Sequence, residues 1–157
     1  MKVLLFALKV IVVLALLVVV AFAGMSAWSR FSPPELGLVD GKLRACPGTP
    51  NCVSSQTDDP GKQVRPMAYV GNREQTETAL RRASMRLGLV AQTQEGDYWH
   101  LKATSQIFRF IDDVEFSFDD ANQVVHLRSA SRAGYSDRGV NRARAEALQA
   151  AMTAAAG

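Results

Sequence analysis

The sequence predicts an α+β domain in which an antiparallel four-stranded meander sheet carries two helices packed on one face, preceded by an N-terminal transmembrane helix. Three observations lead to this fold class. The chain opens with a long apolar segment, its middle alternates between polar and apolar residues, and apolar residues at helical spacing flank that alternating part. The 157 residues, less the apolar segment, suffice for one modest core.

The N-terminal segment Val3–Ala23 is apolar apart from Lys9. At about 1.5 Å per residue it extends roughly 31 Å, which is enough to cross the hydrocarbon core of a bilayer. Lys9 lies close to the start and can reach the headgroups with its long side chain. A retained membrane anchor is therefore our first interpretation of residues 1–24.

A cleaved signal peptide is the alternative interpretation of the same residues. Lys2 and Lys9 would be its charged start, and Ala21-Phe22-Ala23 would be its cleavage site. Both interpretations export the C-terminal domain, because positive charge before a span stays inside. We expect a single-pass protein of the bacterial inner membrane, with a juxtamembrane linker at 25–45 and one globular domain at 46–157 in the periplasm.

Cys46 and Cys52 lie six positions apart in a segment predicted to be exported, and a disulfide is their simplest interpretation. The loop is short, so the bridge would stabilise the fold by only about 2–2.5 kcal/mol. A nucleophilic Cys52 and a metal site are the alternatives. The segment has no histidine to act as a base, and two cysteines are too few ligands for zinc, so the sequence predicts neither metal nor cofactor. Ser54 and Ser55 are interpreted as turn-forming residues rather than nucleophiles.

The helices and strands of the domain are predicted from caps and periodicity. Asn72 and Gln75 form a capping-box pattern at the start of a helix that ends at Gly88. Another helix starts between Ser136 and Asn141 and runs to about Ala155. Between them the pattern predicts four strands, at Leu89–Thr93, Tyr98–Thr104, Phe110–Phe118 and Gln123–Ser131. His100 falls on the polar face of its strand, where a solvated side chain is expected and a catalytic base is the alternative.

The last two strands can be paired by matching side chains across their turn, Asp119–Asn122. In this register Glu115 faces His126, and Asp113 faces Arg128 as an exposed pair worth about 0.2–1 kcal/mol. Asp112 then lies opposite Ser129 on the apolar face. A carboxylate there needs a charged partner, for which Arg142 is our first choice and Arg132 our second.

The segment Arg128–Arg142 is dense in directional hydrogen-bond donors and is the predicted polar centre of the domain. Its positive charge comes after an acidic segment, 112–120, and neighbouring segments of opposite charge more often pair with each other than recruit a partner. The formal net charge of +3 is too small to predict nucleic-acid binding. The candidate ligand-binding residues are Asp112, Arg128, Ser129, Ser131, Arg132, Tyr135, Asp137, Asn141 and Arg142.

Three ordered motifs resemble the bacterial and plastid family called domain of unknown function 1499. They are Pro50-Asn51-Cys52-Val53-Ser54-Ser55, Asp112-Asp113-Val114-Glu115-Phe116 and the segment Arg128–Arg142. The resemblance extends from about Cys46 to the C-terminus, and many similar members carry an N-terminal membrane segment. It implies a single domain. Because the family is named for its unknown function, it implies no catalytic residues.

Two functions are compatible with these residues. The first is a membrane-tethered binding or envelope-assembly module, which holds an anionic small molecule or a carboxylate-bearing partner protein with Arg132, Arg138 and Arg142. The second is a cell-envelope hydrolase or transferase, with Asp112 as general base and Ser129 or Ser131 as nucleophile. A third hypothesis is purely structural, in which a closed network of Asp, Arg and Ser locks the last helix to the sheet.

Overall fold

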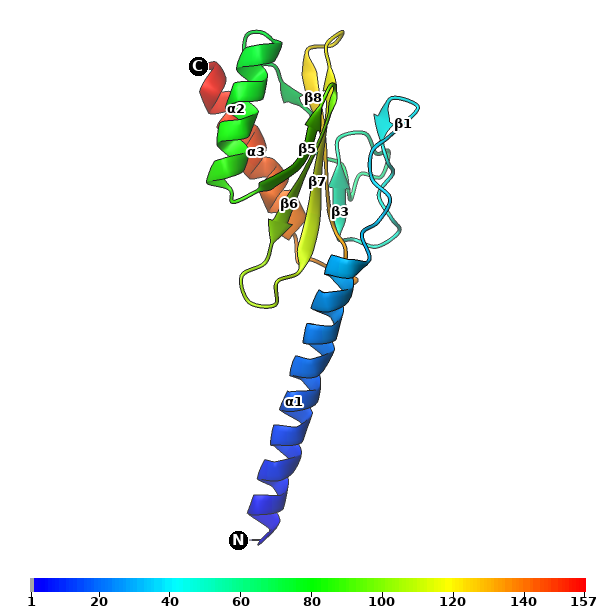
Figure 1. Cartoon of the computed structure of the whole chain (residues 1–157), viewed down its shortest axis with the longest axis vertical. Helices are drawn as coiled ribbons and strands as arrows, with labels where there is room; N and C mark the ends of the chain where they lie inside the picture. The colour runs from blue at the N-terminus through cyan, green and yellow to red at the C-terminus, as the bar shows by residue number, and fades with distance from the viewer. Residues whose placement is uncertain (1) are drawn as a thin grey trace.

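A long helix, α1 (Lys2–Phe31), projects from one end of a layered α+β domain (Figure 1). The computed structural model describes residues 2–157, so Met1 of the predicted anchor lies outside the described residues. The helix is long and apolar enough to cross a membrane. It continues well past residue 24, and Ser26 and Ser29 near its end are buried against the domain. The predicted linker therefore begins as helix.

The central sheet has six strands rather than the predicted four, and all its pairs are antiparallel. Its order is β3-β8-β7-β6-β5, and β4 also pairs with β8. The strands are β3 (Cys52–Ser54), β4 (Met67–Ala68), β5 (Val90–Glu95), β6 (Tyr98–Thr104), β7 (Ile111–Asp119) and β8 (Val124–Ser131). Sequence patterns missed β3 and β4, because strands of two or three residues are too short to show alternation.

Two helices lie on the same side of this sheet in Figure 1, α2 (Arg73–Arg86) and α3 (Val140–Ala156). Asn72 caps α2 with its side chain, and Gln75 completes the predicted capping box. The start of α3 falls within the predicted interval. On the other side of the sheet in Figure 1, a small hairpin of β1 (Leu38–Val39) and β2 (Lys42–Leu43) stands with the linker around it.

The hydrophobic core fills the space between the sheet and the two helices. Alternate residues of the central strands supply one wall, with Trp99, Val114, Phe116 and Leu127 all at most 2% exposed. Leu148 of α3 packs against them. Full burial of a large apolar side chain contributes about 1.5–3 kcal/mol relative to leaving it exposed. This face of the sheet is the one that the sequence predicted to be apolar.

The β7–β8 hairpin keeps its predicted faces, but its register differs from the prediction by two residues. Glu115 pairs with Arg128 instead of His126. The turn lies one residue later along the chain than predicted, because Gln123 adopts a left-handed φ of 52° and joins the turn while Asp119 ends β7. Side chains alternate with period two, so a two-residue change leaves each of them on its own face.

The new register changes the neighbours of both predicted aspartates. Asp113 lies opposite Ala130, and Asp112 lies opposite Ser131 instead of Ser129. Asp113 and Arg128 still share a face, but both are buried, so the expectation of an exposed pair is wrong. The reason is tertiary: the linker and the end of α1 cover a face that the alternation alone would leave in solvent.

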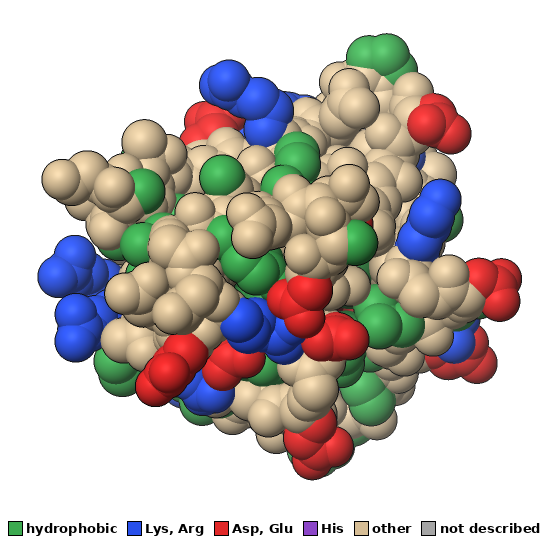
Figure 2. All heavy atoms as spheres, turned by 90° about the horizontal axis from the view of Figure 1, so that it is seen from above, with side chains coloured by type: hydrophobic (Ala, Val, Ile, Leu, Met, Phe, Trp, Pro, Cys, Tyr) green, Lys and Arg blue, Asp and Glu red, His purple; other side chains and the backbone are tan. Residues whose placement is uncertain are grey.

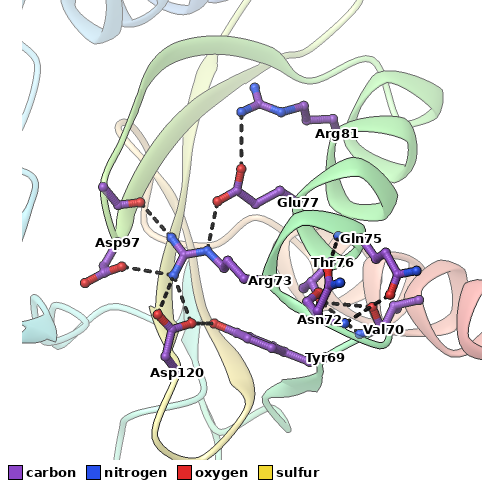
Figure 3. A network of polar contacts seen from close by, with 11 residues as sticks. Tyr69, Val70, Asn72, Arg73, Gln75, Thr76, Glu77, Arg81, Asp97 and Asp120 are labelled. Atoms are coloured by element: carbon purple, nitrogen blue, oxygen red, sulfur yellow. Dashed lines mark hydrogen bonds and ion pairs between the residues drawn. The ribbon is translucent and has the colours of Figure 1, made fainter.

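The end of the domain that faces away from α1 carries acidic and basic side chains interspersed (Figure 2). Figure 3 shows Arg73 of α2 bonded to Asp97 in one hairpin turn and to Asp120 in another, each at 3.0 Å. Tyr69 donates to the same Asp120 carboxylate, and burial together with this bond raises the pKa of Tyr69 to about 12. Arg73 also lies 3.9 Å from the ring centroid of Phe118. The charged groups of this network therefore bind one another, and they fasten α2 to the two hairpin turns of the sheet.

Candidate functional site

The sheet face opposite the helices carries a buried layer of charged side chains from β6, β7 and β8. Glu115 is fully buried, and its Oε2 accepts a hydrogen bond from Arg128 Nη1 at 2.6 Å. Its Oε1 accepts from the Tyr98 hydroxyl at 2.8 Å and from the Gly37 amide of the linker at 3.0 Å. Burial and the Glu115 charge raise the pKa of the Tyr98 phenol above its ordinary value. The linker is thereby fixed to the middle of the sheet.

Asp113, two residues before Glu115 on the same face, is the second buried carboxylate of this layer. Arg132 donates to it through Nε and Nη2, each at 2.7 Å, and His100 Nε2 lies 2.8 Å from Oδ1. Burial alone would raise the pKa of Asp113, but the bonds and charges of His100 and Arg132 outweigh it and hold that pKa below its usual range. Arg132 also donates to the Ser29 carbonyl of α1 at 3.2 Å, so the end of α1 is tied into the layer.

A groove of about 650 Å³ opens over this layer, between the linker and the end of β8. Three arginines line it, Arg44, Arg128 and Arg132, together with the carboxylates of Asp113 and Glu35. Within residues 2–157, the Nε atoms of Arg44 and Arg128 are buried and have no hydrogen-bond partner. Buried polar groups are nearly always bonded, so these two unsatisfied guanidinium donors in the walls of one groove are exceptions that call for an explanation.

The disulfide loop forms one rim of the groove. Cys46 and Cys52 are bonded, as predicted, with their Cα atoms 5.7 Å apart. Asn51 within the loop is 4% exposed, and its side-chain amide donates to the Gly134 carbonyl at 2.7 Å. Its backbone carbonyl accepts from the Ser131 amide at 3.0 Å. The loop is therefore held against the turn that comes after β8.

A second polar cluster lies on the opposite, core-facing side of the sheet. The Ser129 hydroxyl donates to the Asn141 side-chain oxygen at 2.6 Å, and Arg144 donates to both of these groups. Arg144 Nη2 also binds Asp112 Oδ2 at 2.7 Å. Asn141 in turn donates to the Ser131 hydroxyl at 2.9 Å. Every member of this cluster has a partner, and the cluster joins the first turns of α3 to β7 and β8.

The structure corrects the predicted partner of Asp112. Arg144 binds Asp112, whereas Arg142 donates to the carbonyls of Gln63 and Gly61. Arg132 is on the other face, with its guanidinium on Asp113. The Asp112 side chain is also less buried than expected, at 14% exposure. Both arginines lie near the start of α3. Arg144 lies one turn from the buried Asn141 and Leu148, so it shares their sheet-facing side of the helix, whereas Arg142 lies on another side.

A scan against protein families matches residues 42–152 to a family described as Protein of unknown function (DUF1499). The chain belongs to this family. The match begins four residues before Cys46 and ends inside α3, so it includes the disulfide loop, all strands of the central sheet and the three groove arginines. A search of curated proteins finds no match. Glu35, which lines the groove, and the end of α1, whose Ser29 carbonyl accepts from Arg132, lie outside the matched part of this DUF1499 protein.

The nine predicted site residues are spread over several places in the DUF1499 fold. Arg128, Ser131 and Arg132 line the groove. Asp112, Ser129 and Asn141 belong to the core-facing cluster, which Ser131 also joins. The remaining residues lie apart from both: Tyr135 is 74% exposed, Asp137 accepts from the Gly139 and Asn141 amides at the start of α3, and Arg142 binds the 61–63 loop. The sequence thus grouped into one predicted site residues that the sheet separates into two polar clusters.

Six residues of the charged layer and groove were not among the predicted site residues: Glu35, Arg44, Tyr98, His100, Asp113 and Glu115. His100 was expected to be solvated, but it is 8% exposed and bound to Asp113, because α1 and the linker cover its face. The sequence did hold a usable signal. His100 and Tyr98 share one face of their strand, and the acidic residues of β7 lie on the same face of the sheet, where acid and base residues on neighbouring strands favour pairing. Nothing in the pattern around Arg44 marked it.

The fold also brings a histidine to Ser55, which the sequence lacked locally. The Ser55 hydroxyl lies 3.2 Å from His126 Nδ1, and His126 Nε2 lies 3.7 Å from Asp119 Oδ2. However, the Ser55 oxygen also accepts the Leu127 amide hydrogen at 3.0 Å. This contact fastens the chain after β3 to β8, in keeping with the turn-forming role expected for Ser55. Among residues 2–157, no group of three or more His, Cys, Asp or Glu could hold a metal ion.

Proposed function

We propose that this protein is a membrane-tethered binding module whose groove between the linker and β8 takes the carboxylate or phosphate group of an anionic ligand or envelope partner. The tether is α1, which is long and apolar enough to span a bilayer. The orientation that we propose rests on Lys2, which precedes the apolar segment, and on Lys9 near its start; both lysines would stay on the cytoplasmic side. The domain would then stand in the extracytoplasmic space.

The observation that carries the binding proposal is the pair of unpaired Nε donors on Arg44 and Arg128. Arg128 is 6% exposed and already gives Nη1 to Glu115, so its Nε has lost water without gaining a protein acceptor. A buried donor left unbonded costs about 1–3 kcal/mol, which an incoming oxygen would recover. Arginine groups also recognise planar anions through paired donors.

The charge of the groove fits an anion of low charge. Three arginines line it against two carboxylates, Asp113 and Glu35. Asp113 is occupied by Arg132 and His100, so the free donors belong to the two other arginines, Arg44 and Arg128. Arg44 pairs with the exposed Glu35 at 3.1 Å, and such an exposed pair contributes only about 0–1 kcal/mol and can be exchanged for a ligand.

The test is a thermal-unfolding titration of the full chain in detergent micelles with acetate and, separately, with inorganic phosphate. Binding to the folded state alone raises stability by about RT ln(1 + [L]/Kd), so the melting temperature should rise with anion concentration. Arg44→Gln should abolish that rise, because it removes a guanidinium from the groove without stranding a buried carboxylate. The anion that acts at lower concentration distinguishes a carboxylate site from a phosphate site.

Arg138→Gln is the matched control, since it makes the same change in charge at an exposed arginine outside the groove lining. Phosphate stabilises many proteins by exclusion from their surfaces, so the difference between the two variants is the decisive quantity. Equal responses of wild type, Arg44→Gln and Arg138→Gln would contradict a specific site in the groove.

The alternative hydrolase or transferase requires Asp112 to activate Ser129 or Ser131. Asp112 Oδ2 instead accepts from Arg144, and the Ser129 hydroxyl donates to the Asn141 amide oxygen, which is no base. A serine without a base is a weak nucleophile. These contacts support a structural role for the core-facing cluster, and they leave the groove as the better candidate for function.

A further inference from the structure

The loop between β6 and β7 presents apolar side chains at its tip. Its base is closed by two bonds, from the Ser105 amide to the Phe110 carbonyl and from the Phe110 amide to the Ser105 hydroxyl, each at 2.9 Å. Between them Ile107 is 83% exposed and Phe108 is 38% exposed, while Arg109 comes next with a left-handed φ of 59°. Neighbouring apolar side chains that are exposed together at one loop tip are typical of a contact surface.

This loop lies against the anchor helix, at the end of its apolar segment. Phe22 of α1 stacks on Phe108 with ring centroids 4.7 Å apart, and Phe110 lies 6.1 Å from the same ring. Figure 1 shows the loop on the side of the domain from which α1 leaves. Phe22 is the next-to-last residue of the segment Val3–Ala23 that would cross the membrane.

The point along α1 at which its side chains pass from exposed to buried against the domain indicates the level of the bilayer surface. Residues 3–21 of α1 are exposed, whereas Ser26 and Ser29 are buried against the domain. The helix therefore enters the protein within about one turn after Phe22. A loop that packs on Phe22 is at the level where the hydrocarbon meets the headgroups, which is also where aromatic side chains concentrate.

We propose that the β6–β7 loop is a second membrane contact, with Ile107 and Phe108 inserted into the boundary between acyl chains and headgroups. Arg109 beside them would face the headgroup phosphates, as basic residues of interfacial segments do. This inference rests on the proposed tether. A helix alone leaves the domain free to swing, whereas two contacts fix its orientation and therefore the direction in which the groove opens.

Lipid is the occupant that the geometry favours, because the apolar tip is continuous with the apolar surface of α1 through the Phe22 ring. A partner protein bound to the tip would have to lie in the same layer as the headgroups. The loop is held by two hydrogen bonds between its own residues, so its shape does not depend on a partner. The expected contact is therefore an insertion of preformed structure rather than folding on binding.

The experiment uses three single-cysteine variants of the full chain in vesicles of phosphatidylethanolamine and phosphatidylglycerol. Ile107→Cys tests the loop, Leu14→Cys lies within the span, and Ala121→Cys lies in the exposed β7–β8 turn. Because Cys46 and Cys52 are bonded to each other, only the introduced thiol takes a fluorescent label. Quenching is then measured with lipids that carry a nitroxide on the acyl chain.

The expected result is strong quenching at position 14, clear quenching with blue-shifted emission at 107, and neither effect at 121. Quenching at 14 together with a water-exposed label at 107 overturns the loop proposal and leaves the tether intact. No quenching at 14 overturns the tether, and the loop proposal falls with it. Ile107→Ser with Phe108→Ser, labelled at Gln106→Cys, should show less quenching than the label at Gln106→Cys alone, and equal quenching also overturns the proposal.

Discussion

Replacing Glu115 with glutamine is the sharpest test of the buried charged layer. The substitution keeps the volume of a side chain that is fully buried, and it removes one negative charge. The glutamine oxygen can still accept from Tyr98 and from the Gly37 amide, as Oε1 does now. Its NH₂ group, however, takes the place of Oε2. In the native protein Arg128 Nη1 donates to Oε2 at 2.6 Å, so in the variant two donors face each other.

The expected loss of stability comes from the charge that the substitution strands. Arg128 is 6% exposed and has Glu115 as its ion-pair partner, so the variant holds an uncompensated buried charge. Removing one partner of a buried pair costs about 3–5 kcal/mol. Because native domains are stable by only about 5–15 kcal/mol, Glu115→Gln should remove a large share of the total.

Urea unfolding of the full chain in micelles measures this loss, with the fluorescence of buried Trp99 as the signal in a Trp28→Phe background. The midpoint should fall at an unchanged slope. The double variant Glu115→Gln with Arg128→Met removes the stranded charge, so it should be more stable than Glu115→Gln alone. A single variant within about 1 kcal/mol of wild type, or a double variant whose loss is the sum of both singles, would refute the reasoning.

Other predictions concern the remaining pairs and the topology. Arg144→Ala should cost about 2–4 kcal/mol of unfolding free energy, somewhat less than the Glu115 change because its pair is 12–14% exposed; denaturant unfolding checks this. The pKa of Asp113 is lowered in the folded state, so its contribution is fully present above the unfolded value near 3.8 and is lost as pH falls through the folded pKa. Acid unfolding should accordingly become less steep in Asp113→Asn. In protein isolated from cells, neither Cys46 nor Cys52 should react with an alkylating reagent before reduction, and labelling of native protein would contradict export into an oxidising space. A reporter enzyme that is active only outside the cytoplasm, fused after Gly157, should be active, and an inactive fusion at normal expression would reverse the orientation.

The candidate site was only partly predictable, and the residues show why. Arg128 and Arg132 were chosen because the segment Arg128–Arg142 is unusually dense in directional hydrogen-bond donors, and both of them line the groove. Arg44 was missed because it comes to the groove through the linker, far along the chain from Arg128. Glu115 was expected in solvent because the alternation of polar and apolar residues predicts two faces of the sheet. It does not predict that the linker and α1 cover the polar face.

Features that depend on neighbouring residues were determined by the sequence alone. The sequence predicts the apolar part of α1, the capping box at Asn72, the bond between Cys46 and Cys52 and the two faces of the β7–β8 hairpin from spacings of a few residues. Tertiary structure decided the two-residue change in register, the short strands β3 and β4, and the choice of Arg144 for Asp112. Each of these features depends on contacts between segments that are distant in the sequence. Local periodicity does not predict the free energy of such contacts. The burial of the second sheet face is the clearest case, since the linker turns an expected wet surface into a paired, charged layer.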